Sequence, residues 1–361
     1  MKVALHQVFL KKITLWMCLL LLFGALKIFS GFLAEKYYPN YMYIDAWVER
    51  ITYFNSEDLE SYIDELAHKV NSDEQYRKHV GKDFTALLKS YKNRAFVCNL
   101  INFAENGQGV LSSKIPDDFE KMQDFYRQLS VPSIINEQPL NRYFLMQSIN
   151  FVPIFVLLLC AVIWGEHYEN GIDKISSSTL KGSYYHRTID VILISLSLFF
   201  LTVNEFFDLW YSGLLEHKYI WKCSVQSYDY FRYTQLQCNI GSVLLISFIS
   251  KLIGMFCLNF LGMFIARWKR SVKESAIWTI LILIALFFFG KSLENTKFYA
   301  IIQIGIVDWK MIISKIRIFS PLQQNTLLLG ILFTILVAVA ICRGLVLKRY
   351  PKMQILGNRR L

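Results

Sequence analysis

The stretch FVPIFVLLLCAVIWGEHYENGIDKISSSTLKG, residues 151–182, changes character near its midpoint. Residues 151–165 are almost all apolar, whereas residues 166–182 are polar, charged and interrupted by glycine. Another apolar run, 189–201, follows shortly afterwards. A charged segment between two apolar runs is typical of a loop that joins two membrane-spanning helices. This stretch therefore favours a membrane protein.

The composition agrees with a membrane protein. Of the 361 residues, 54% are hydrophobic and 16% are aromatic, whereas soluble domains are about 45–50% apolar. A spanning helix needs roughly 20 mostly apolar residues. Six segments are apolar enough to be candidates: 13–34, 143–165, 189–211, 240–266, 275–290 and 326–347. The sequence thus predicts an all-α polytopic membrane protein with six transmembrane helices.

The first of these segments also resembles a secretory signal peptide, because it follows the basic residues Lys2, Lys11 and Lys12. However, its apolar region continues to Ala34 without a small-residue cleavage site. The apolar region of a signal peptide is only about 7–15 residues long. We therefore expect a retained membrane anchor.

The distribution of basic residues predicts the orientation. With the N-terminus in the cytoplasm, the cytoplasmic pieces hold 16 Lys and Arg in 62 residues, against eight in 63 residues of the short outer loops. This twofold excess follows the positive-inside rule and places both termini in the cytoplasm. The net charge of +11 is then explained by topology, so no nucleic-acid partner is expected.

The chain is predicted to have three parts. Residues 1–34 form the N-terminal segment and first span, residues 35–142 an extracytoplasmic domain, and residues 143–361 the remaining five spans. The domain contains DLESYIDELAHKV and DDFEKMQDFYRQL, both with apolar residues at helical spacing. Ser56 is a plausible helix start. We therefore expect a mainly helical domain outside the membrane.

Catalytic and metal-binding motifs are not found in the sequence. It has no phosphate-binding Gly-x-x-x-x-Gly-Lys-[Ser/Thr] loop, no His-Glu-x-x-His and no cysteine pair with zinc spacing. We therefore expect neither an enzyme nor a cofactor in this chain. Cys223 and Cys238 enclose one predicted outer loop; they either form a disulfide or remain free thiols.

Two lysines, Lys27 and Lys251, stand within apolar runs. A charge inside the membrane is a candidate functional residue. The alternative is that each side chain extends to the outer interface, which lysine does readily. On the predicted registers both lie in the outer halves of their spans, which favours the second interpretation.

Residues 166–187, EHYENGIDKISSSTLKGSYYHR, resemble the first cytoplasmic loop of ABC-2 type permeases. In that family an acidic residue ends the second span, and a glycine, a Ser/Thr-rich stretch, a further glycine and an arginine follow. The residues that match this order are Glu166, Glu169, Gly171, Ser178, Thr179, Gly182 and Arg187. Here four residues, 183–186, separate the last glycine from the arginine. Residues 223–245 are similar to the outer loop before the fourth span in a Gram-positive branch of the family, which also has a large outer domain.

The resemblance implies the membrane subunit of a bacterial ABC transporter in the plasma membrane, exporting a lipid, a peptide or a drug-like substrate. Its partners would be an ATP-binding subunit, which holds the ATP and magnesium, a second permease subunit and membrane lipids. Residues 166–188 would be the ATPase-coupling loop, with a short helix beginning at Asp173. The simpler alternative is that this loop is a solvated connector. A different function is a membrane sensor that does not transport, with 35–142 as its ligand domain.

Overall fold

The computed structural model describes residues 13–41, 43–106, 119–148, 152–172, 182–234 and 236–292. The regular structure in this part of the chain is helical, apart from one isolated antiparallel bridge between Ser224 and Asn239. The helices are α2 (Ile13–Tyr37), α3 (Ile44–Ile51), α4 (Ser56–Ser72), α5 (Glu74–Asn106), α6 (Phe119–Arg127), α7 (Gln138–Ser148), α8 (Val152–Glu169), α10 (Gly182–Tyr211), α11 (Lys218–Lys222), α12 (Ile240–Lys269), α13 (Val272–Ser292) and the 3-10 turns η2 (Val225–Ser227) and η3 (Asp229–Phe231).

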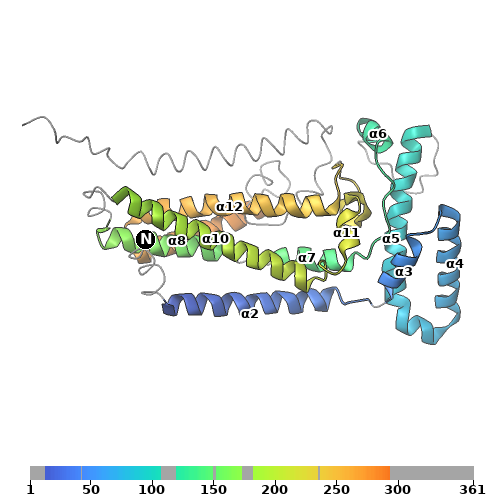
Figure 1. Cartoon of the computed structure of the whole chain (residues 1–361), viewed down its shortest axis with the longest axis horizontal. Helices are drawn as coiled ribbons and strands as arrows, with labels where there is room; N and C mark the ends of the chain where they lie inside the picture. The colour runs from blue at the N-terminus through green and yellow to red at the C-terminus, as the bar shows by residue number, and fades with distance from the viewer. Residues whose placement is uncertain are drawn as a thin grey trace, which may run out of the picture.

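The helices form two parts (Figure 1). Helices α2, α8, α10 and α12 run along a common direction and make an elongated bundle, and α8 also packs against α13. At one end of this bundle, α5 lies across its long axis, with α3, α4 and α6 around it. We call α3 to α6 the end domain. The chain passes from α2 into the end domain and returns to the bundle through α7.

Helix α8 is the centre of the bundle core. It packs against α12 and α13, and its buried residues Leu157, Cys160 and Trp164 belong to one hydrophobic cluster with residues of α10 and α12. Close approach of α8 and α12 depends on Gly262. A Cβ atom at this position would lie 2.8 Å from the Cβ of Cys160 and 3.2 Å from the carbonyl oxygen of Leu157.

The end domain has its own core. Apolar residues of α3, α4 and α5 form one buried cluster that includes Trp47, Ile63 and Leu87. The predicted helix within DLESYIDELAHKV is α4, and it begins where the sequence indicated. Its N-cap is Asn55, one residue before the predicted Ser56, because the Asn55 side chain accepts a hydrogen bond of 2.8 Å from the Asp58 backbone nitrogen.

A third cluster joins the end domain to the bundle. It combines Leu140 and Phe144 of α7 with Tyr228 and Phe231 of the segment before α12, and it extends to Val243 of α12. Polar contacts connect α5 to the same segment, since the Asn93 amide donates to the backbone oxygens of Gln226 (3.0 Å) and Ser227 (3.2 Å). The end domain therefore rests directly on the loops at this end of the bundle.

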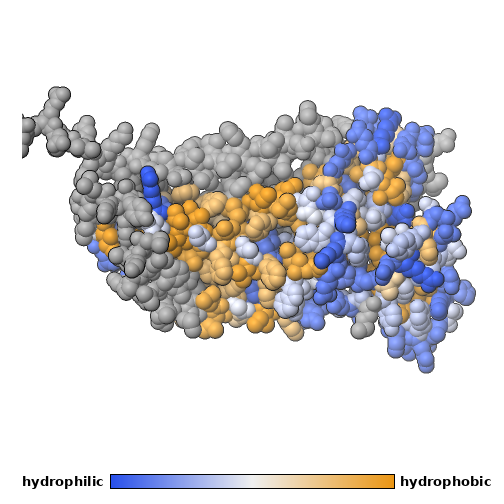
Figure 2. Space-filling view, viewed as in Figure 1, coloured by the Kyte–Doolittle hydropathy of each residue, from blue (hydrophilic) through white to orange (hydrophobic). Residues whose placement is uncertain are grey.

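The bundle exposes apolar residues and buries charged ones. Figure 2 shows its described residues mostly as apolar, whereas the end domain is mostly polar. Leu21, Ile28 and Phe32 of α2 are 60–70% exposed, whereas Lys27 on the same helix is 5% exposed. Other large apolar residues exposed on α10 and α12 are Val191, Leu198, Phe199, Val203, Phe206, Trp210, Leu245, Ile249, Phe264 and Trp268.

The prediction of six transmembrane helices is wrong for this structure. Among the residues that it describes, one helix, His186–Tyr211 within α10, is long and apolar enough to cross a membrane. The predicted span 143–165 is divided between α7 and α8, and in α12 the described apolar stretch is the shorter segment Ile240–Ile249. Helix α13 has Lys273 and Glu274 in its first turn. The predicted span 326–347 lies outside the described residues.

We expect the change Gly262→Ala to destabilise the bundle by about 1–3 kcal/mol, because the added methyl group forces α8 and α12 apart. The thermal unfolding midpoint of the purified protein in detergent measures this. Gly24→Ala on α2 is the matched control, since nothing lies within 4 Å of a Cβ there and the change should be neutral or stabilising. Equal midpoints for the two variants would contradict the close packing at Gly262.

Candidate functional site: a buried ion-pair network

Two ion pairs lie inside the bundle. The Nζ of Lys27, on α2, is 2.7 Å from Oδ1 and 2.9 Å from Oδ2 of Asp208, on α10. The Nζ of Lys251, on α12, is 2.7 Å from Oε1 of Glu205, also on α10. All four side chains are at most 10% exposed. Two positive and two negative charges are therefore held together away from the surface.

Polar side chains join the two pairs into one network. Gln147, on α7, donates to Oδ2 of Asp208 at 2.7 Å and accepts a short hydrogen bond from Lys251. Tyr143, one helical turn earlier, donates to Oε2 of Glu205 at 2.8 Å. Asn204 donates to Oδ2 of Asp208 at 3.1 Å. The network thus connects α2, α7, α10 and α12.

The positions of these residues in sequence explain how they meet. Asn204 and Asp208 are four residues apart on α10, so they share one face of that helix, and Glu205 lies beside them. Tyr143 and Gln147 have the same spacing on α7. Helix α7 therefore presents a phenol and an amide between the acidic residues of α10 and the lysine of α12.

Burial makes this network sensitive to the loss of any one charge. Removing a charge from water costs several kcal/mol, and only close, hydrogen-bonded partners offset that cost. Both oxygens of each carboxylate have a partner here. The network contains no Ser, Thr or Cys, and its one hydroxyl is the phenol of Tyr143, which donates to Glu205. The described residues contain no group of three or more His, Cys, Asp or Glu that could hold a metal ion. The arrangement suits the positioning and movement of charge better than covalent catalysis.

Two of the four charged residues of this site, the two lysines, were identified from the sequence. Lys27 and Lys251 were identified as charges within apolar runs, but the favoured interpretation, that they extend to the interface, is wrong, since both are buried and paired. Glu205, Asp208 and their polar neighbours were missed. The available signal was that these two acids stand within the predicted span 189–211, where each needs a nearby cation.

The predicted coupling loop is described only in part. Glu169 is exposed, and its Oε2 accepts a hydrogen bond of 2.8 Å from the backbone nitrogen of Val272, the first residue of α13. Glu166 is half-buried on α8, and Arg187 is exposed near the start of α10. Asp173, Ser178 and Thr179 lie outside the described residues.

Gly171 ends the turn after α8 with φ of +65°, a conformation that favours glycine. The sequence had indicated a glycine that permits a change of direction at this point. The hydrogen bond from Val272 to Glu169 lies just before this turn, so α8 and α13 are joined where the chain leaves the bundle.

Of the two alternatives for the outer-loop cysteines, the structure has the free thiols. Cys223 and Cys238 are both free thiols in the structure. Their backbones are neighbours, because Ile240 donates to the Cys223 carbonyl (2.9 Å) and Val225 donates to that of Cys238 (3.1 Å). This register pairs each cysteine with an apolar residue and places the two cysteines diagonally. Diagonal neighbours are about 7–8 Å apart, beyond the usual disulfide range of about 4.4–6.8 Å.

A second polar contact connects the end domain to the bundle. His217, in the loop after α10, has its Nε2 2.9 Å from Oδ2 of Asp45, on α3. The hydrogen bond with Asp45 raises the pKa of His217. Burial acts to raise the pKa of Asp45, but hydrogen bonds from His217 and Asn136 outweigh burial and lower it.

Comparison of the chain with protein-family models, with curated proteins and with solved structures finds no match.

We expect Lys27→Met to lower the free energy of unfolding by about 3–5 kcal/mol, because it leaves the buried carboxylate of Asp208 without its cation. The double change Lys27→Met with Asp208→Asn should recover much of this loss, since an amide oxygen still accepts from Gln147 and Asn204. Lys36→Met, at the exposed end of α2, is the control. Denaturant unfolding followed by tryptophan fluorescence gives the values, and a double variant no more stable than the single one would contradict the pairing.

The Asp45–His217 contact should weaken at alkaline pH. The stabilisation from a raised histidine pKa is complete below its unfolded value of 6.5 and is lost as the pH rises through the higher folded value. The contribution of Asp45 is lost only at acidic pH, below its unfolded value of 3.8. The thermal midpoint should therefore fall between pH 6 and pH 8 more steeply in the wild type than in His217→Asn. Parallel profiles would show that this contact does not titrate as described.

Proposed function

We propose that this chain is the membrane subunit of a transporter whose energy comes from a separate ATPase of the ABC type. One observation carries the membrane part of this proposal: the bundle has its charges inside and its apolar side chains outside. Exposed Leu, Ile and Phe are unfavourable as a continuous surface in water. They are the expected surface of helices that face lipid, while ionisable residues face the bundle interior.

The ion-pair network supports transport rather than a passive anchor. An anchor needs no charge in its interior, because apolar side chains pack there at lower cost. Here Lys27 and Lys251 come from different helices and are held by acids of a third helix, α10. A relative movement of α2 or α12 against α10 changes these contacts. The network therefore suits a bundle that changes between arrangements while keeping its charges compensated.

The energy source is proposed from the resemblance of residues 166–187 to an ATPase-coupling loop. The sequence has no nucleotide-binding loop of its own. Glu169 lies at the end of α8, with its carboxylate on the first backbone nitrogen of α13. A partner that contacts this region would therefore act on two packed helices of the bundle at once.

A second candidate function is a sensor that does not transport, with residues 35–142 as its ligand domain. It is favoured by the direct contact of α5 with the segment before α12, through Asn93. A ligand on α5 would change the position of that segment. The two functions differ in their partners, because the transporter requires a bound ATPase at residues 166–171 and the sensor does not.

We expect Glu169→Ala to reduce association with the ATPase subunit by about threefold or more. The variant Glu169→Gln shows whether the hydrogen bond to Val272 or the negative charge causes this loss. The Gln side chain can still accept the hydrogen bond from Val272, so recovery by Gln assigns the effect to the position of α13. Loss in both variants assigns it to the negative charge. Association is measured by co-purification of an ATP-binding subunit from native membranes, at equal levels of the tagged chain.

The matched control is Glu57→Ala, an exposed acid in the first turn of α4. It should leave co-purification unchanged. If no ATP-binding subunit co-purifies with the wild-type chain, the transporter proposal is wrong and the sensor is favoured.

A further inference from the structure

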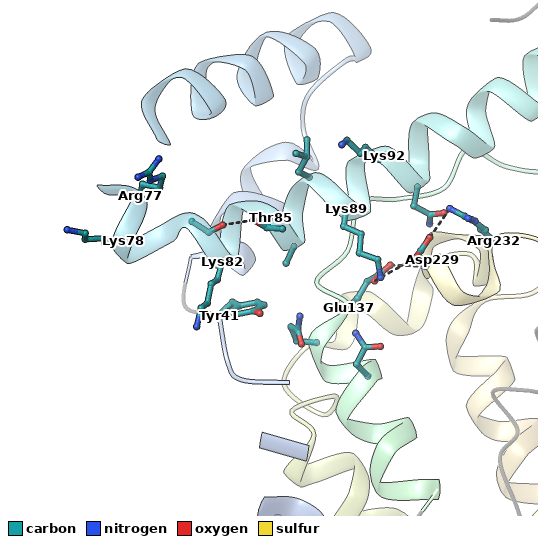
Figure 3. A pocket seen from close by; sticks show the side chains of 16 residues that line it. Tyr41, Arg77, Lys78, Lys82, Thr85, Lys89, Lys92, Glu137, Asp229 and Arg232 are labelled. Carbon is teal, nitrogen blue, oxygen red and sulfur yellow. Dashed lines mark hydrogen bonds and ion pairs between the residues drawn. The ribbon is translucent and has the colours of Figure 1, made fainter. Parts of the chain in front are cut away.

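A groove of about 1010 Å³ lies between α5 and the adjacent end of the bundle (Figure 3). One wall of the groove is the first half of α5. The other wall is formed by Gln138 and Asn141 of α7 and by Glu137, which comes just before α7. Tyr41 and η3 lie at the ends of the groove. Six of its lining side chains are cationic and two are acidic: Arg77, Lys78, Lys82, Lys89, Lys92 and Arg232, with Glu137 and Asp229. The groove is therefore strongly basic.

The two acids are already used within the protein. Lys89 bridges them, with its Nζ 3.2 Å from Glu137 and 3.0 Å from Asp229. Arg232 lies 3.1 Å from the other oxygen of Asp229, and the Asp229 backbone nitrogen donates to Glu137 at 2.7 Å. These groups form the base of the groove, and Figure 3 shows them together at one side of α5.

The remaining cations have no comparable partner. Arg77, Lys82 and Lys92 make no ion pair with any residue that the structure describes. Lys78 pairs only with Glu74 on its own helix, and both side chains are 70% exposed. Such exposed pairs contribute about 0–1 kcal/mol, so Lys78 can readily take another anion.

These cations follow one face of α5. Lys78, Lys82, Lys89 and Lys92, with Thr85 between them, recur at intervals of three, four and seven residues, which places them in one line along the helix. Gly81 lies within this face, and a Cβ there would meet only the Cγ of Arg77, at 3.5 Å. The missing side chain leaves the helix surface open beside Lys78 and Lys82.

The position of the groove indicates the source of the anion. Tyr37 ends α2 and Trp210 lies at the end of α10; both are well exposed, on the side of the bundle next to the end domain. Exposed aromatic residues at the end of an apolar bundle are typical of the membrane–water interface. The groove is therefore close to the depth of lipid headgroups.

We propose that this groove binds the phosphate headgroup of an anionic membrane lipid. This inference rests on the proposed membrane location of the bundle. Lysines on one helix face supply several mobile point charges for phosphate oxygens. Thr85, Asn141 and Gln138 add neutral polar groups suited to the hydroxyls of a headgroup. An acidic peptide is the less suitable occupant, because the volume is that of a small-molecule site.

The experiment uses the full chain reconstituted in phosphatidylcholine vesicles with increasing phosphatidylglycerol. After solubilisation, the phosphatidylglycerol retained per protein is measured by native mass spectrometry. The double variant Lys82→Gln/Lys92→Gln should weaken retention about thirtyfold, since each lysine near a charged headgroup contributes on the order of 1 kcal/mol and 1.4 kcal/mol is a factor of ten. Gly81→Leu, which fills the groove without changing the charge, should also lower retention.

The control is Lys218→Gln/Lys222→Gln, which removes two exposed lysines of α11 outside the groove. Equal retention in the groove variants, the control and the wild type would overturn the headgroup site. Release of the lipid by an acidic peptide at constant ionic strength, without release by inorganic phosphate, would overturn its assignment to a phosphate headgroup. Flotation with pure phosphatidylcholine vesicles is measured separately, so failure of membrane insertion is distinguished from failure of this site.

Discussion

The pairing of buried charges inside an apolar bundle constrains most of this structure. The two buried carboxylates of α10, Asp208 and Glu205, each require a cation within hydrogen-bond distance, so α2 and α12 must place Lys27 and Lys251 at the same depth. Helix α7 must in turn reach the same depth to supply Gln147. The relative heights of four helices are thus fixed by hydrogen bonds, whereas apolar packing alone would tolerate several arrangements.

The two ends of the bundle are held by different physical means. At the end domain, an apolar cluster centred on Phe144 and Tyr228 is surrounded by polar contacts such as Asn93 with Gln226. At the opposite end of α8, close contact and a helix cap hold α13. A Cβ at Gly165 would lie 3.1 Å from the Cα of Val272, whose backbone nitrogen is bound by Glu169. Helix α8 therefore lies, closely packed, between the end domain and the opposite end of the bundle.

Local structure was predicted from the sequence more successfully than long-range structure. The periodicity of residues 58–70 gave α4, and Gly171 has the positive φ that a sharp turn requires. These features depend on neighbours in the chain. The partners of Lys27 and Lys251 are 181 and 46 residues away, and no local pattern identifies them. The six-helix prediction failed because apolar composition shows neither where a helix breaks, as between α7 and α8, nor which polar side chains it must bury.

Helix α2 has a special place in the bundle because few groups hold it there. It packs chiefly against α7, and its contacts with α10 include the Lys27–Asp208 pair and the ring of Tyr211 against Gly31. Its other side presents Leu21, Ile28 and Phe32 to the surroundings. Only residues 38–43 separate it from α3 of the end domain. A displacement of the end domain reaches α2 through residues 38–43, and α2 can move against α10 only if the Lys27–Asp208 pair, the Phe23–Phe200 ring contact and the hydrogen bond from Tyr211 to Glu35 change.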